Sequence, residues 1–178
     1  AKETANFING AINDGFKDGI GIGEAVGARI AKAKLPHRRF SILATGHELN
    51  IPVTVHVAIG TDIIHQHPSA NGEAIGEGSL LDFRNFIYSV GRLENGVAVN
   101  FGSAVILPEV FLKAVTVARN LGYKLNAFNT ANFDMISQYR PYQNILSRPT
   151  SSGGKGYNII GHHELMFPLL YRSIIEKI

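Results

Sequence analysis

Apolar, β-branched stretches separated by helical patterns are the feature that most limits how this chain can fold. Three of them lie at Ile51–Gly60, Gly96–Ile106 and Lys124–Ala131, and the shorter "YNII" follows at Tyr157–Ile160. Near-continuous apolar runs of this kind are typical of strands buried on both faces of a parallel sheet. A further short strand is expected at Phe40–Gly46.

Helical patterns fill the rest of the chain. We expect a helix from about Thr4 to Ala33 that is interrupted near Gly19–Gly23, and a second helix at Ser79–Leu93 with Ser79 as its N-cap. A third runs over Pro108–Gly122, and a closing helix begins near His163. Strands that alternate with helices predict a single α/β domain over residues 1–178, with helices on both faces of a mostly parallel sheet.

The amino-acid composition excludes several classes of site and partner. The 178 residues include no cysteine, which excludes disulfides, zinc–thiolate sites and a cysteine nucleophile. Apolar runs are too short to span a bilayer, and the first ten residues lack a signal-peptide pattern, so we expect a soluble, cytoplasmic protein. Net charge is only +3, and the one dense basic cluster, Lys32–Arg39, is interpreted as a solvated helix end. We therefore expect neither a nucleic-acid nor a membrane partner.

Two glycine-rich stretches resemble phosphate-binding loops without matching them. "GIGIGEAVG" at Gly19–Gly27 lacks the spacing of a dinucleotide fingerprint, and no strand precedes it, so it is interpreted as a helix break. In "SSGGKG", no Ser or Thr follows Lys155 to hold magnesium. What remains is a lysine on a bendable loop, either exposed and idle or buried and nucleophilic.

Small polar residues follow the expected strands. Ligands of parallel α/β sheets bind at the carboxyl ends of the strands. Those ends are predicted at Gly60–Asp62, Gly102–Ser103 and Asn129–Ala131, which leave room for a ligand to approach the backbone. Asp134, at the end of "NTANFD", either contacts that ligand or makes a local turn.

Histidines offer a weaker alternative. A histidine metallohydrolase would need His65 and His67 together with either His162 or His163 around one metal ion. Adjacent histidines point in different directions and H-x-H also occurs in ordinary loops, so no metal site is expected.

Five motifs in order resemble one known family. "IPVTVHVAIGTD", "NFGSAVILPEVFLKAVTVARNLG", "FNTANFD", "GGKG" and "LMFPLL" follow one another between Ile51 and Leu170. Their order is similar to that in deoxyhypusine synthase. The resemblance implies a Rossmann-like NAD-binding sheet, of which this chain looks like the C-terminal part, in a homotetramer. It also implies NAD-dependent oxidation of spermidine to an imine, followed by transfer of the aminobutyl group through an enzyme lysine.

The resemblance also implies site residues. Lys155 stands at the position of the nucleophile, and Asp134 near the polyamine. Glu109 stands where the family has a histidine facing the polyamine, and His162 where it has an aspartate near the cofactor. Contacts to NAD are implied for Thr61, Asp62, Gly102, Ser103, Thr130, Ala131 and His162.

Two functions follow from these residues. One is an NAD-dependent aminobutyl transferase acting on spermidine or a related amine. The other is a nucleotide-binding protein of the same fold without the transfer chemistry. Lys155 separates them: a desolvated lysine facing the cleft favours the enzyme, and a lysine in solvent favours the binding protein.

Overall fold

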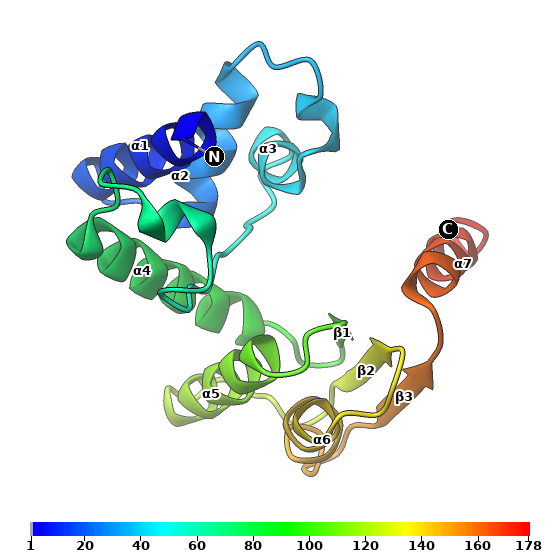
Figure 1. The fold of residues 1–178 in the computed structure, drawn as a ribbon. Coiled ribbons are helices and arrows are strands. Elements are labelled where there is room, and N and C mark those ends of the chain that lie inside the picture. The colour runs from blue at the N-terminus through cyan, green and yellow to red at the C-terminus, as the bar shows by residue number, and fades with distance from the viewer. Residues whose placement is uncertain (1) are drawn as a thin grey trace. The chain divides into compact units, whose positions relative to one another are not determined.

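The computed structural model describes residues 2–178, which form two compact units. Unit 1 ends at Phe86 and unit 2 begins at Ile87. Figure 1 shows the chain coloured from its N-terminus to its C-terminus. The prediction of a single domain stays a prediction.

Unit 1 is helical (Figure 1). Its core joins α1, α2, η2 and the start of α4 through buried aliphatic side chains, among them Ile12, Val26 and Ile75. The elements are α1 (Lys2–Asp18), α2 (Ile22–Lys32), η1 (Arg38–Phe40), α3 (Ile42–Glu48), η2 (Ile63–Gln66) and α4 (Gly72–Val90), whose last residues begin unit 2.

The predicted interruption between α1 and α2 is confirmed, and its cause is a buried carboxylate. Asp82 of α4 is 1% exposed, and its Oδ2 accepts a hydrogen bond from the Gly23 N–H at 2.9 Å. A Cβ at Gly21 would overlap Asp82, and one at Gly23 would overlap the Val53 carbonyl. The glycines of "GIGIG" therefore let the start of α2 pack directly against the buried Asp82 carboxyl group. Burial raises the pKa of this carboxyl group.

Two predictions about local structure in unit 1 are wrong. The strand expected at Phe40–Gly46 is helix α3, because Ser41 Oγ accepts a hydrogen bond from the Ala44 N–H at 3.2 Å and caps the helix. Ser79 is not an N-cap. It lies inside α4, which begins seven residues earlier at Gly72, where Asn71 Oδ1 accepts from the backbone N–H of Glu73 at 3.0 Å.

The strand predicted at Ile51–Gly60 is also wrong. The segment runs without helix or strand pairing, because side chains of α4 bind its backbone. The Val55 N–H donates to Asp82 Oδ2 at 2.8 Å, and the Val57 N–H donates to Ser79 Oγ at 3.3 Å. Those distant partners replace the neighbouring strand that the local pattern predicts.

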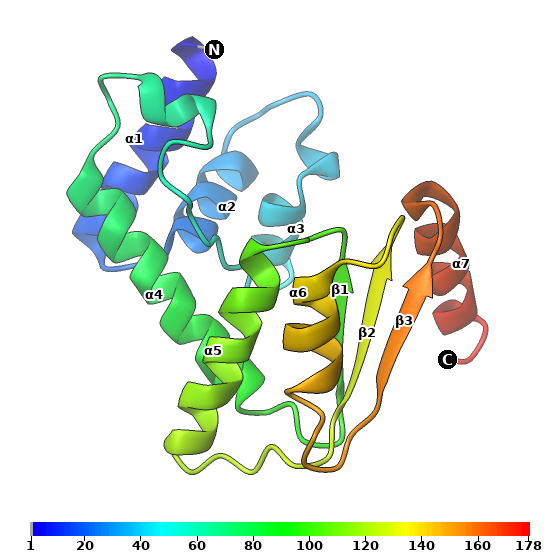
Figure 2. The same ribbon diagram turned by 60° about the horizontal axis from the view of Figure 1, so that its bottom comes forward.

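Unit 2 holds a three-stranded parallel sheet in the order β1-β2-β3, flanked by helices. In Figure 2, α5 and α6 lie on one side of the sheet and α7 on the other. This confirms the predicted α/β fold with a Rossmann-like parallel sheet. The elements are β1 (Val97–Phe101), α5 (Ile106–Asn120), β2 (Asn129–Asp134), α6 (Tyr139–Pro141), the wider turn η3 (Tyr142–Ser147), β3 (Gly156–Ile160) and α7 (His163–Ile175).

The strand predicted at Lys124–Ala131 begins later, at Asn129, and ends at Asp134. Leu125 and Phe128 precede it as buried core residues, and the ring of Phe128 meets Phe111 edge to face with centroids 6.3 Å apart. The apolar pattern there reports burial under α5 and not strand pairing. No helix among residues 2–178 is long and apolar enough to cross a membrane.

Candidate functional site

The carboxyl edge of the unit 2 sheet is built by the residues that end its three strands. Gly102 follows β1 with a left-handed backbone (φ 65°), which favours glycine. Its N–H donates to the Phe133 carbonyl of β2 at 3.0 Å, and the Gly161 N–H after β3 donates to the Asp134 carbonyl at 3.0 Å. The ends of the strands are thus tied to one another, and the residues beyond them share one edge.

His163, the first residue of α7, covers Gly102. A Cβ at Gly102 would lie 3.1 Å from His163 Nε2. The Nδ1 atom of His163 is buried and has no hydrogen-bond partner within residues 2–178. Its neighbour His162, predicted to bind NAD, is exposed and lies 3.9 Å from Glu164. The histidine that meets the predicted cofactor path at Gly102 is therefore His163.

An asparagine ladder crosses the sheet just below this edge. Asn100, Asn132 and Asn158 occupy one register position on β1, β2 and β3. Asn100 Nδ2 donates to Asn132 Oδ1 at 2.7 Å, and Asn132 Nδ2 donates to Asn158 Oδ1 at 2.9 Å. The ladder also reaches the loops at both ends, through the Ser103 carbonyl at 3.1 Å and Ser137 Oγ at 3.2 Å. It therefore fixes both the strand register and the two loops of the edge.

Two buried oxygens on the same strand have no partner among the described residues. Asp134 is 8% exposed, and while its Oδ1 accepts from the Met135 N–H at 2.7 Å, its Oδ2 accepts nothing. Thr130 Oγ1, at the other end of β2, is also unpaired, and this residue is fully buried. Because β2 begins at Asn129, the prediction that Asn129–Ala131 ends a strand is wrong, while contacts of Thr130 and Ala131 with NAD stay a prediction. Unpaired buried polar atoms are costly, so they mark a place where a ligand group or water would be stabilised.

Ser103 and Glu109 already have partners at this edge. Ser103 Oγ accepts from the Leu107 N–H at 3.1 Å, which caps the start of α5. Glu109 binds Lys113, and its Oε1 accepts from Asn144 Nδ2 at 2.7 Å. The hydrogen bond from Lys113 is the main cause that lowers the pKa of the Glu109 carboxyl. Glu109 therefore joins α5 to η3, and its predicted contact with an amine stays a prediction.

Lys155 lies at the other end of the strands. It directly precedes β3 and its side chain is exposed. Its N–H donates to Asn129 Oδ1 at 3.0 Å, and its carbonyl accepts from the Thr130 N–H at 2.8 Å, both at the start of β2. By the criterion set from the sequence, an exposed lysine favours the binding protein over the transferase.

The glycines around Lys155 are needed for packing. A Cβ at Gly154 would overlap the Phe128 carbonyl, and one at Gly156 would come too close to the Leu146 backbone. Arg119 of α5 holds the loop from outside, because its Nη2 donates to the Pro149 carbonyl at 2.7 Å and to Ser152 Oγ at 2.9 Å. The loop is a packed crossing of backbone segments, and its glycines are required by that packing.

Thr61 and Asp62, which are also predicted NAD contacts, belong to unit 1. Asp62 is the N-cap of η2, where its Oδ1 accepts from the Ile64 N–H at 3.1 Å. It follows no strand, so the prediction that it ends a sheet strand is wrong, while its contact with a ribose stays a prediction.

The histidines of the same loop are used locally. His65 Nδ1 accepts from the Gly60 N–H at 3.1 Å, and His67 Nδ1 lies 2.8 Å from Ser69 Oγ. Across residues 2–178, no three His, Asp or Glu side chains gather as metal ligands.

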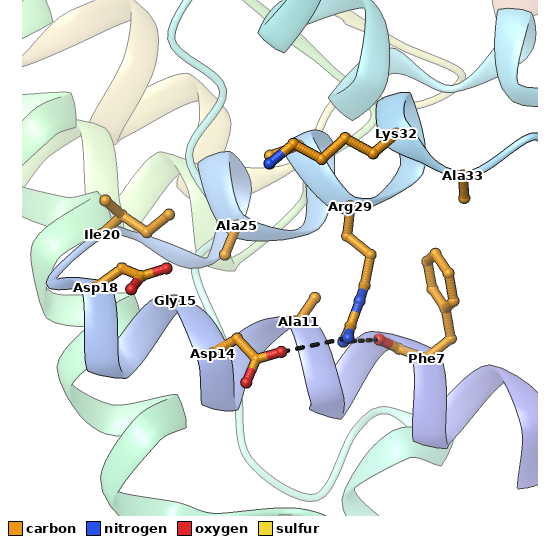
Figure 3. A pocket seen from close by; sticks show the side chains of 11 residues that line it. Phe7, Ala11, Asp14, Gly15, Asp18, Ile20, Ala25, Arg29, Lys32 and Ala33 are labelled. Carbon is orange, nitrogen blue, oxygen red and sulfur yellow. Dashed lines mark hydrogen bonds and ion pairs between the residues drawn. The ribbon is translucent and has the colours of Figure 1, made fainter.

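Unit 1 has an open groove of about 460 Å³ between α1 and α2 (Figure 3). Arg29 crosses it and lies 3.3 Å from Asp14, while its Nη1 donates to the Phe7 carbonyl at 3.2 Å. Asp18 and Lys32 stand at its rim, and small side chains such as Ala11 and Ala25 line its floor. Its charges are balanced, and it is a groove of the helix pair with no group placed for chemistry.

The sequence did not predict the asparagine ladder, and it did not predict that His163 contacts the residue after β1. A signal for the ladder was present, because "VNFG" and "ANFD" place an Asn-Phe pair at the end of two strands and "YNII" places Asn before two apolar residues. Asparagine is disfavoured inside strands, so its repetition at one register position indicates partners across the sheet. Nothing in the sequence distinguishes His163 from His162.

Comparison of the chain with protein-family models, with curated proteins and with solved structures finds no match.

Proposed function

We propose that this chain binds a nucleotide, with NAD as the first candidate, at the carboxyl edge of the unit 2 sheet. One observation carries the proposal: the parallel strands end together at an edge where Gly102 has a left-handed backbone and where two buried atoms, Asp134 Oδ2 and His163 Nδ1, have no partner within residues 2–178. Ligands of α/β sheets bind at this edge, and a glycine there lets a phosphate approach the backbone. The order of motifs that resembles deoxyhypusine synthase supports NAD over other nucleotides.

Calorimetric titration with NAD tests the proposal. Wild-type protein should bind NAD, and Gly102→Ala should weaken binding at least tenfold, because the left-handed backbone and His163 leave no room for a Cβ. Gly122→Ala is the matched control, since Gly122 also has a positive φ (88°) but lies in open space after α5. NAD affinity that is equal in the two variants would remove Gly102 from the site, and no heat from the wild type would refute NAD.

Aminobutyl transfer is the second candidate, and a specific observation favours its amine substrate. The unpaired Asp134 oxygen, buried at the proposed nucleotide edge, suits a protonated amine. Transfer through an imine on Lys155 would require the exposed amine at the opposite end of β3 to become desolvated next to the substrate. The binding function is therefore the better supported of the two.

Chemical trapping of an imine on Lys155 distinguishes aminobutyl transfer from nucleotide binding alone. Under the transfer hypothesis, NAD, spermidine and borohydride should leave an adduct on Lys155 that peptide mass spectrometry detects, and Lys155→Arg should abolish it. Spermidine turnover without an adduct, at the same rate in Lys155→Arg, would exclude the nucleophile. Loss of spermidine binding in Asp134→Asn, with NAD binding kept, would locate the amine whatever the role of Lys155.

We also propose that the chain acts in the cytoplasm as a homo-oligomer. The absence of cysteine suits the reducing compartment. Support for the oligomer comes from α7, an apolar helix with no buried residue, on which Phe167 and Tyr171 are 60% and 62% exposed. Large exposed apolar surfaces mark protein interfaces. Sedimentation velocity of the full chain should show a tetramer, and Phe167→Glu should shift it toward smaller species.

A further inference from the structure

The most strand-like segment of the sequence pairs with no strand. Residues Pro52–Val57 lie beside α4 outside any helix or strand, and the N–H groups of alternate residues on one edge are bound by two α4 side chains, as in an extended segment. Asp82 Oδ2 accepts from the Val55 N–H at 2.8 Å, and Ser79 Oγ accepts from the Val57 N–H at 3.3 Å. Ser79 Oγ also lies 3.5 Å from the Val55 carbonyl, to which it donates. This edge of the segment therefore imitates a paired strand.

The opposite edge of the segment has no backbone partner in the part of the chain that the structure describes. In an extended chain, backbone groups of alternate residues face opposite edges, so those of Thr54 and His56 face away from Asp82 and Ser79. Within residues 2–178, the N–H groups of Thr54 and His56 donate no hydrogen bond to another backbone group. The side chains of the two residues bind each other, since Thr54 Oγ1 lies 3.0 Å from His56 Nε2. They therefore do not supply the hydrogen-bond partners of this backbone edge. A row of unpaired backbone groups at this spacing is complementary to another extended strand.

An apolar groove extends from the start of the same segment. It has a volume of about 320 Å³ and lies between α3 and Ile51–Val53, with Arg39 at its rim. Phe40 and Ile42 line it and are 71% and 78% exposed. The Ile51 N–H donates to the Gly46 carbonyl at 2.8 Å, so the wall formed by the segment is fixed to α3. The groove is thus preformed and suits an apolar side chain from an incoming strand.

The chain itself contains a strand with the matching edge. β1 is an edge strand, because it pairs with β2 alone. Alternate residues at the start of β1 are exposed valines: Val97 is 60% exposed and Val99 is 46% exposed. Its outward backbone groups and exposed valines are what an unpaired strand beside an apolar groove would bind.

We propose that Pro52–Val57 accepts the β1 edge of a second copy of this chain as an added strand. The interface joins the Thr54 and His56 backbone groups of one copy to the outer edge of β1 in the other. The inference rests on the proposed homo-oligomer and assigns it a contact separate from α7.

A peptide of residues 96–103, GVAVNFGS, labelled with a fluorophore, is the direct probe of this interface. Its binding to the full chain is measured by fluorescence anisotropy. Thr54→Pro removes the outward N–H and keeps the inward Val55 and Val57 bonds, so it should weaken peptide binding at least tenfold. Thr54→Val keeps the N–H at similar size and should change binding less than twofold. Circular dichroism confirms that both variants fold.

Amide exchange and sedimentation of the same proteins separate the outcomes. Peptide binding that Thr54→Pro abolishes, with slower exchange of the Thr54 and His56 amides on self-association, supports the interface. Absence of peptide binding, with those amides already protected in the monomer, overturns it. A tetramer that survives Thr54→Pro leaves the homo-oligomer standing and overturns this contact. A wild-type chain that stays monomeric at every concentration but binds the peptide refutes the second copy as the occupant.

Discussion

The segments that follow the unit 2 strands and the loop that precedes β3 differ in how their polar groups are paired. At the carboxyl edge, Asp134 Oδ2 and His163 Nδ1 are buried without partners in the described chain. At the amino edge, Thr130 Oγ1 has no partner within residues 2–178, but the loop around Lys155 is fixed by hydrogen bonds to Arg119 and Asn129. An edge with unsatisfied buried atoms is stabilised by a ligand, whereas an edge whose groups are bound is a structural lock. The difference indicates where a ligand would bind better than glycine content does.

Glycine serves each edge differently. Gly102 supplies a left-handed turn that brings the next chain segment over the edge. Gly154 and Gly156 press directly against backbone carbonyls and leave no free space. A glycine-rich sequence therefore reports close backbone approach, and only the approaching group decides between a ligand site and a packed crossing.

The largest effect on stability should come from disrupting the packed loop around Lys155. Gly154→Ala places a Cβ against the Phe128 carbonyl, which cannot move without shifting the start of β2. We expect a loss of about 3 kcal/mol or more in the free energy of unfolding, measured by urea denaturation. The control is Gly76→Ala in α4, where nothing lies within 4 Å and the helix should gain up to about 1 kcal/mol. Equal stability of the two variants would show that the loop is loosely packed.

The next effect concerns the ladder at the carboxyl edge. Asn132→Ala removes the central amide, leaves Asn158 Oδ1 without its donor and should cost about 2–3 kcal/mol of unfolding free energy. Asn158→Ala removes the exposed end of the ladder and one acceptor of the buried Asn132 amide, and should cost less, about 1 kcal/mol. Urea unfolding of both variants measures the difference. A larger loss for Asn158→Ala than for Asn132→Ala would contradict the ladder.

A smaller effect on stability is expected when the pH is lowered, because Glu94 at the amino edge becomes protonated. Glu94 accepts the backbone N–H groups of Asn126 at 2.7 Å and Ala127 at 3.0 Å. The hydrogen bond from Ala127 is the main cause that lowers the pKa of Glu94 below its ordinary 4.5. The folded pKa is thus below the unfolded one, so this stabilisation is present above about pH 4.5 and is lost as the pH falls through the folded pKa.

Thermal unfolding of Glu94→Gln between pH 7 and pH 3 tests the acid effect. The variant should lose less stability than the wild type as the pH falls. Parallel pH profiles for the two proteins would mean that Glu94 does not contribute.

The smallest effect is expected at Lys155. Because its side chain is exposed at the amino edge, Lys155→Ala should leave NAD affinity and thermal stability unchanged within error. A tenfold loss of NAD affinity would move the ligand to the lysine loop and revive the transfer hypothesis.

The sequence predicted what local patterns control. The break between α1 and α2, the helix α5 with its closing glycine, the strand β3 and the helix α7 all follow from periodicity and punctuation. The wrong strand at Ile51–Gly60 has a non-local cause, because Asp82 and Ser79 lie more than twenty residues away. The ladder and the unpaired Asp134 oxygen likewise depend on register and burial, which one sequence read locally does not contain.

Amide hydrogen exchange with and without NAD tests the central claim most directly. If the carboxyl edge binds the nucleotide, NAD should slow exchange in peptides covering residues 102–107, 135–138 and 161–164 and leave residues 150–156 unchanged. The two sets report on opposite ends of the same strands, so each serves as the control for the other. Slower exchange confined to residues 150–156, with none at the strand ends, would contradict the account.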